Sequence, residues 1–190
     1  MPSILLTGPA VEPVTLAEAK SHLRVAHDDD DDLIAALIAG SRIHVEMQTR
    51  RALITQAWRL TRDVWPDSGL LAVLPVPLLS LVAVRIYASD NTALTLDLAA
   101  FIVDKAAAPA LLAFAHAPPT PGRAAAGIEI DITAGYGTTP ASVPQPLRQA
   151  IRLLTAHWYE NRGLATVANA IAVLPATVAA LIAPYRVLAL

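Results

Sequence analysis

Histidine is the residue type in this 190-residue chain best suited to acid–base or metal chemistry. The five histidines are His22, His27, His44, His116 and His157. None lies in an H-E-x-x-H pattern, which would place two imidazoles on one helix face around a metal ion. His157 and Glu160 are three residues apart and can share a helix face, but a single His-x-x-Glu pair is a weak metal signal. We therefore interpret His157 as a hydrogen-bonding residue and expect no metal site.

The remaining candidates for catalysis are equally weak. Ser41 and Ser142 lack the G-x-S-x-G pattern of a nucleophile elbow, and the absence of cysteine excludes a thiolate nucleophile, disulfides and Cys-based metal sites. Gly135-Tyr136-Gly137 lacks the further glycine of a dinucleotide-binding loop and follows a predicted strand, so a turn is the simpler interpretation. The sequence predicts a protein that is not an enzyme and has no cofactor.

The acidic run Asp28–Asp32 could suggest a calcium site. It lacks the alternating ligands, central glycine and closing glutamate of an EF-hand loop. Acidic side chains stabilise the first turn of a helix, where the backbone amides are unpaired and the dipole is positive. We therefore expect these aspartates to begin a helix.

Composition limits the classes of partner. The net charge of −2 and the pI near 6.2 argue against a high-affinity nucleic-acid binder, which normally carries a basic excess. The range Gly163–Tyr185 is uncharged and long enough to cross a bilayer. Asn169 and Pro175 interrupt it, so we expect two helical segments joined by a turn and no membrane association.

Helical patterns lie on both sides of the chain's middle. Thr15 and Glu18 form a T-x-x-E capping box that predicts a short helix to about Val25. A longer helix is predicted from about Asp30 to Arg51. Its inward residues would be Leu33, Ile34, Leu37, Ile38 and Val45, and its outward residues Arg42, Glu46, Thr49 and Arg50. The pair Gly40-Ser41 would let another backbone approach closely.

The range Val143–Arg162 carries the best-marked helix, entered through prolines and ended by Asn161 and Gly163. Its apolar face comprises Leu147, Ile151, Leu154 and Trp158. A polar stripe on the other side comprises Arg148, Arg152, Thr155, Tyr159 and Arg162.

From residue 54 to residue 137 the pattern changes to a period of two, with about six or seven short strands. The clearest is Gly127–Thr133, in which three isoleucines alternate with polar residues. The expected fold class is α+β, a bundle of about four helices with an antiparallel β subdomain inserted between the second and third helices. Residues 1–53 and 138–190 would form the helical part, with an extended N-terminal arm and a C-terminal tail, and residues 54–137 the β subdomain.

Several segments, in this order, resemble the head-tail connector family of long-tailed bacteriophages and gene transfer agents, also called head-tail adaptors. They are T-L-A-E-A-K-S-H-L-R-V at Thr15–Val25, the aspartates and apolar helix from Asp28, R-R-A-L-I-T-Q-A-W at Arg50–Trp58, L-P-V-P-L-L-S-L near Leu74, A-G-Y-G at Ala134–Gly137, V-P-Q-P-L-R-Q-A-I-R-L-L-T-A-H-W-Y-E-N-R at Val143–Arg162, and P-Y-R at Pro184–Arg186. The resemblance covers nearly the whole chain, although the β region matches only in outline.

The resemblance implies a structural virion protein with a helical core. Such proteins form a homo-oligomeric ring, usually of twelve copies, beneath the portal vertex. The ring joins the portal protein to the next neck or tail protein, a stopper or a tail terminator, and DNA passes through its lumen without sequence-specific binding. The expected location is the neck of a phage or phage-like particle, assembled in the bacterial cytoplasm.

In such adaptors the C-terminal segment often docks into the portal. The corresponding tail here is Pro184, Tyr185, Arg186, Val187, Leu188, Ala189 and Leu190, whose apolar end has little reason to pack into its own bundle, although simple fraying is an alternative. Arg148, Arg152, Tyr159 and Arg162 could contact a neighbouring subunit, face DNA in the lumen, or remain solvated. The expected helical core is Leu33, Leu37, Leu147, Ile151, Leu154 and Trp158.

A different function also fits the sequence. The β subdomain could recognise a ligand or another virion component, with the helices serving only as its scaffold.

Overall fold

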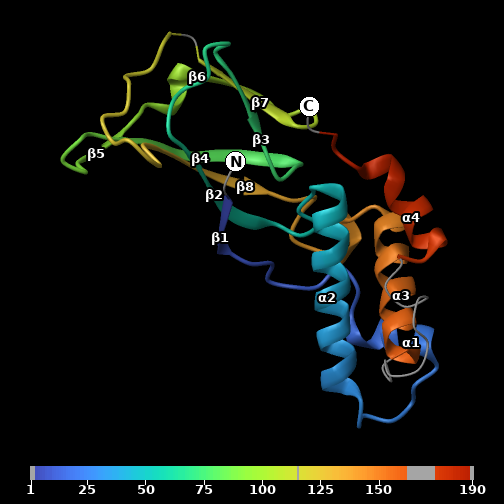
Figure 1. Cartoon of the computed structure of the whole chain (residues 1–190). Helices are drawn as coiled ribbons and strands as arrows, with labels where there is room; N and C mark the ends of the chain where they lie inside the picture. The colour runs from blue at the N-terminus through green and yellow to red at the C-terminus, as the bar shows by residue number, and fades with distance from the viewer. Residues whose placement is uncertain (1–2, 115, 162–173, 189–190) are drawn as a thin grey trace. The chain divides into compact units, whose positions relative to one another are not determined.

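The computed structural model describes residues 3–114, 116–161 and 174–188, which form two compact units (Figure 1). The helical unit contains the described residues of 10–54 and 137–186, and the β unit those of 3–9, 55–136 and 187–188. The predicted α+β class is confirmed, with the strands β2 to β8 inserted between the second and third helices.

The helical unit contains four α-helices: α1 (Leu16–Leu23), α2 (Asp31–Thr49), α3 (Gln145–Glu160) and α4 (Ala176–Ile182). The helix α3 packs against each of the other three. A 3-10 turn, Pro140–Ser142, precedes α3, and another, Ala183–Tyr185, follows α4. None of the described helices is long and apolar enough to cross a membrane.

The helix starts agree with their sequence signals. The predicted capping box is confirmed, since the Thr15 amide donates to Glu18 Oε2 at 2.9 Å and the Glu18 amide donates to Thr15 Oγ1 at 3.2 Å. The acidic run places Asp31 and Asp32 in the first turn of α2, as predicted. Lys20 Nζ lies 2.6 Å from carboxylate oxygens of both Asp28 and Asp31, so the run also ties α1 to the start of α2.

The core of the helical unit is formed where one face of α2 meets α3 and α4. Its fully buried apolar side chains include Ile34, Ile38, Val45, Leu147, Ile151, Leu154, Val178 and Ile182. Leu33 and Leu37 are only half-buried because the inward stripe of α2 follows positions 34, 38, 41 and 45. Trp158 is also half-buried, and its ring packs edge-on against His44 at 6.0 Å between centroids.

Two residues predicted to point outward from α2 are buried, so that prediction was wrong. Arg42 donates from Nε to Glu12 at 2.8 Å and from Nη1 to Glu46 at 2.7 Å, and these carboxylates satisfy its buried charge. Thr49 donates to the Val45 carbonyl at 2.7 Å, which lets its hydroxyl be buried. Gly40 approaches the indole of Trp158 rather than another backbone, because a Cβ there would lie 3.4 Å from Trp158 Cζ3.

The β unit contains two antiparallel sheets. The larger has the order β1-β2-β8-β4-β5, and the smaller has the order β3-β7-β6. Their bounds are β1 Ser3–Thr7, β2 Gln56–Arg62, β3 Leu70–Val73, β4 Leu78–Tyr87, β5 Ala93–Thr95, β6 Phe101–Asp104, β7 Ala110–Phe114 and β8 Ile128–Ala134. The N-terminal segment, predicted to be an extended arm, is an edge strand of the larger sheet paired with β2.

The central strand β8 shows the predicted alternation. Ile128, Ile130 and Ile132 are buried on one face of the sheet, whereas Glu129 and Asp131 lie on the other. Leu60 of β2 lies opposite Ile130, and Ile86 of β4 lies opposite Ile128, which extends the buried face across three strands. Trp65, Phe101 and Phe114 form an aromatic cluster beside the smaller sheet, with centroid separations from 5.2 to 6.3 Å.

The difference in burial between neighbouring α2 residues predicts a difference in stability. Ile34→Ala removes a fully buried side chain and should lower the free energy of unfolding by about 2–5 kcal/mol. The half-buried Leu33 is the matched control, and Leu33→Ala should cost clearly less. Urea unfolding followed by far-ultraviolet circular dichroism measures both variants. Equal losses would contradict this assignment of the α2 core.

Candidate functional site

The residues first considered for chemistry are engaged in local structure. His157 lies 3.4 Å from the Asn161 side-chain amide, which also donates to the His157 carbonyl at 2.7 Å and closes the end of α3. Ser142 shares a 3.1 Å hydrogen bond with Thr139. Gly137 turns the chain beside Ser142, where a Cβ would lie 2.5 Å from the Ser142 hydroxyl oxygen. Within residues 3–114, 116–161 and 174–188, no cluster of three metal-binding side chains occurs.

The most developed polar cluster of the helical unit is built around Arg148 of α3. Its Nε donates to the Pro13 carbonyl at 2.9 Å, and its Nη2 donates to Glu18 Oε1 at 2.6 Å. Arg152, one turn later, donates to the same Glu18 oxygen at 3.1 Å. The Arg148 residue is 8% exposed, so its charge lies within the unit and is matched by Glu18. The cluster therefore fastens the start of α1 to α3.

Hydrogen bonds and charge favour the ionised form of Glu18. Its pKa is lowered chiefly by the hydrogen bond from the Thr15 backbone, with further lowering by the guanidinium groups of Arg148 and Arg152. Partial burial opposes these effects by penalising the charged form. One carboxylate thus serves as helix cap and as partner of two arginines.

The described residues of the polar stripe on α3 form hydrogen bonds with other segments of the same chain. Tyr159 donates its hydroxyl proton to the Asp30 carboxylate, which joins α3 to the start of α2. Thr155 is buried and bonds Ser41 of α2 at 3.1 Å between hydroxyl oxygens. Arg162 lies outside the described residues. A contact of Arg148, Arg152, Tyr159 or Arg162 with a neighbouring subunit or with DNA stays a prediction, and Arg148 is not on an exposed surface.

The predicted tail is held by its own chain over its first half. Pro184 and Tyr185 lie in the 3-10 turn after α4, and Arg51 donates from Nε to the Tyr185 carbonyl at 2.7 Å. Arg186 donates to the Gln48 side chain at 3.1 Å. Val187 is 6% exposed, whereas Leu188 is 81% exposed. The exposed residues of the described tail are Pro184, Arg186 and Leu188, and Ala189 and Leu190 lie outside the described residues.

A second ionic cluster crosses the polar face of the larger sheet. Asp131 of β8 accepts two hydrogen bonds from Arg59 of β2, at 2.7 and 2.9 Å, and one from Arg85 of β4 at 2.7 Å. Arg59, followed by Arg85, lowers the pKa of Asp131 despite its partial burial. Tyr87 donates to Glu129 at 2.9 Å, which raises the Tyr87 pKa. These groups neutralise one another across three strands and leave no unmatched catalytic base.

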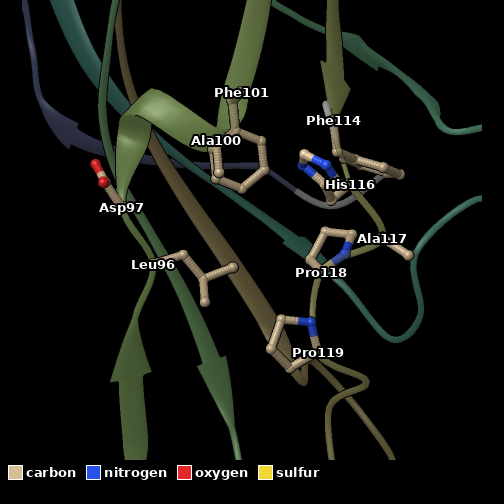
Figure 2. A pocket seen from close by; sticks show the side chains of 9 residues that line it. All are labelled: Leu96, Asp97, Ala100, Phe101, Phe114, His116, Ala117, Pro118 and Pro119. Atoms are coloured by element: carbon tan, nitrogen blue, oxygen red, sulfur yellow. The ribbon is translucent and has the colours of Figure 1, made fainter.

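A small apolar pocket of about 180 Å³ lies in the β unit (Figure 2). It is lined by Leu96, Asp97, Ala100, Phe101, Phe114, His116, Ala117, Pro118 and Pro119. Figure 2 shows the Asp97 carboxylate turned away from the cavity, and its Oδ1 accepts the Ala99 amide at 3.0 Å. His116 is therefore the one titratable side chain directed toward the pocket, which lacks the acid–base pair of a hydrolytic site.

Comparisons with known proteins point to one class. Residues 13–95 match the profile of the family described as phage gp6-like head-tail connector protein. No curated protein matches the chain. The chain is similar to a chain of the virion of a native gene transfer agent particle, with 23% identity and a TM-score of 0.85. Chains of two gene transfer agent necks, one from an empty particle computed with C6 symmetry and one from a native particle computed with C12 symmetry, show 24% and 25% identity and TM-scores of 0.83 and 0.80.

Each of these structural matches covers 100% of this chain and 97% of the other chain. The similarity therefore includes the helical unit and the β unit together. With the family match over residues 13–95, it confirms the resemblance to head-tail connectors that the sequence motifs indicated.

The role of Glu18 beyond its cap was missed from the sequence. The capping box located Glu18 but could not indicate its arginine partners, which lie 130 and 134 residues away. Glu12, the partner of the buried Arg42, was missed for the same reason, since it lies in an irregular segment 30 residues earlier.

Glu18→Gln tests the cluster around Arg148. Loss of the charge weakens the capping box and both arginine contacts, so the variant should lose about 1 kcal/mol of unfolding free energy near neutral pH. Because the folded-state pKa of Glu18 is lowered, its stabilisation exists above the ordinary carboxyl pKa and is lost as the pH falls through the folded value. The difference between wild type and variant should therefore shrink on acidification, as measured by urea unfolding at several pH values.

Asp29→Asn is the control for Glu18→Gln, since the Asp29 side chain is 94% exposed. It should leave stability near its wild-type value. A Glu18→Gln deficit that stays constant down to acidic pH would contradict an electrostatic role for Glu18.

Proposed function

We propose that this protein is a structural head-tail connector of a phage-like particle. Copies of it form a ring in the neck, join the portal to the next neck or tail protein, and surround the channel through which DNA leaves. The ring carries out no catalysis.

One observation carries this proposal: the similarity to chains of gene transfer agent necks extends over the whole chain, including both units. The family match over residues 13–95 supports the same class from the sequence. The C12 symmetry used for one of those necks supports a ring of identical copies.

The site chemistry is compatible with a structural role. The buried arginines Arg42 and Arg148 are paired with Glu12, Glu46 and Glu18, and Asp131 is paired with two arginines. These charged side chains form ion pairs that hold the elements of the fold together, which suits a structural protein. A net charge of −2 also suits a channel wall, because each phosphate neutralised would add affinity for DNA and slow its passage.

The neck location can be tested directly. Particles from cells that produce this protein should show, by electron cryo-microscopy of the neck, a symmetric ring into which this fold fits. A small domain fused to the protein serves as a label and should add density at that ring. If cells that lack the gene still produced intact particles with an unchanged neck, the proposed function would be refuted.

The tail can be tested at the boundary found in the structure. A chain that stops after the buried Val187 removes Leu188 to Leu190 and should keep its fold, because the contacts of Arg51 and Arg186 remain. If the exposed end docks into the portal, the amount of the truncated protein bound to particles should be at least ten-fold lower than that of the wild type. A ten-fold loss corresponds to about 1.4 kcal/mol of binding free energy.

Leu188→Ala is the length-preserving control for the truncation, and circular dichroism checks the fold of both variants. Full attachment of the truncated protein would eliminate the tail as the portal contact.

A further inference from the structure

The two edges of the larger sheet are open and apolar. The strands β1 and β5 end the strand order, so that among the described strands neither has a partner on its outer side. Every residue of both strands is exposed, and neither strand contains a charged residue or a proline. Edge strands are normally protected from pairing by such residues. Here the sole protective irregularity of β1 is a bulge between Leu5 and Thr7.

One exposed leucine at each edge, Leu5 of β1 and Leu94 of β5, lies on the same face of the sheet. Leu5 of β1 is opposite Trp58, which is opposite the buried Ile132 of β8. At the other edge, Leu94 of β5 is opposite Ile86, which is opposite the buried Ile128. The residues Leu5, Trp58 and Ile132 form one row across the sheet, and Leu94, Ile86 and Ile128 form another. Because directly opposite residues share a face, both rows lie on the face of β8 that carries its isoleucines.

Each apolar row is therefore covered in the middle and uncovered at one end. Leu5 is 46% exposed and Leu94 is 53% exposed, whereas Ile132 and Ile128 are buried. A further strand placed beyond either edge, with apolar residues on the same face, would cover the exposed leucine and pair the free backbone groups.

The directions of the strands make the two edges complementary. All four neighbouring pairs in the order β1-β2-β8-β4-β5 are antiparallel, so β1 and β5 run in the same direction. A second sheet placed beside the first, with the same face and direction, would set its β5 parallel to β1. Leu94 of that copy would then lie on the same face as Leu5 and continue the apolar surface.

We propose that β1 of one copy pairs with β5 of the next copy, so that the larger sheets join edge to edge around the ring. This inference rests on the proposed ring function and assigns the surface through which copies meet. A second copy is the occupant because one contact uses both open edges and repeats identically in every copy, as a cyclic assembly requires. Pairing of β1 with β1 would leave both β5 edges open and would stop at a dimer.

The absence of cysteine makes cross-linking a direct test. The double variant Leu5→Cys/Leu94→Cys is incorporated into particles and treated with a bis-maleimide that spans about 10 Å, roughly twice the separation of neighbouring strands. Denaturing electrophoresis should then show a ladder of covalent multimers up to the size of the ring. Leu5→Cys alone and Leu94→Cys alone should show no ladder, because each contact then carries one thiol.

The matched control is Leu5→Cys/Ile102→Cys. Ile102 is similarly exposed but lies in the smaller sheet, so this pair should give no ladder. A second test replaces Leu5 by lysine, which places a charge in the proposed contact. Leu5→Lys should reduce incorporation into necks at least ten-fold with an unchanged circular dichroism spectrum, whereas Ile102→Lys should be incorporated normally.

Two failures can be told apart. A neck that contains the ring but gives no ladder from Leu5→Cys/Leu94→Cys, together with normal incorporation of Leu5→Lys, would overturn the strand pairing and leave the connector function standing. Absence of the wild-type protein from the neck would instead overturn the proposed function.

Discussion

The hydrogen bonds of the Arg148 guanidinium hold the start of α1 against α3 in the helical unit. The guanidinium bonds the Pro13 carbonyl before α1 and the Glu18 carboxylate within α1, while its own helix packs against α1, α2 and α4. A buried arginine is tolerated only when its donors are matched by acceptors, and here one carboxylate and one carbonyl provide them. Glu18 also caps α1, so the cap and the contact between helices cannot be changed independently.

The same arrangement recurs elsewhere in the chain. Arg42 is satisfied by Glu12 and Glu46, and Arg59 and Arg85 converge on Asp131. In each case a partly or fully buried charge joins segments that are distant in sequence. Such pairs add little net stability compared with apolar packing, but they penalise any arrangement that separates the partners. They suit a protein whose proposed task is to hold a shape inside a larger assembly.

Local signals in the sequence were sufficient for the fold class and most element positions. The capping box at Thr15, the acidic start of α2 and the alternation of β8 each act over a few residues, and each is present in the structure. What could not be read was which polar residues turn inward. Periodicity assigns every arginine to the solvent side. Arg42 and Arg148 are nevertheless buried, and each is paired with a carboxylate that lies 30 or 130 residues away in the sequence.

Strand order was beyond sequence reasoning for a related reason. The strand β8 lies between β2 and β4, and β1 lies at the edge beside β2, so pairing is set by contacts between segments far apart in the chain. The N-terminal residues show no sustained period, and an uncharged pentapeptide with three apolar residues is as compatible with an extended arm as with an edge strand. The family resemblance supplied the class of protein but matched this β region only in outline.

The alternation of the chain between its two units has a consequence for synthesis. The helical unit needs residues 137–186, including α3 with Arg148, to complete the core begun by residues 10–54. During translation α1 and α2 are therefore made before β2 to β8, and their apolar faces remain uncovered until α3 follows these strands. The inserted strands can pair before the helices that flank them are able to close. The nascent chain thus passes through a stage in which Ile34 and Ile38 are open to chaperones or to neighbouring chains, and completion of α3 ends that stage.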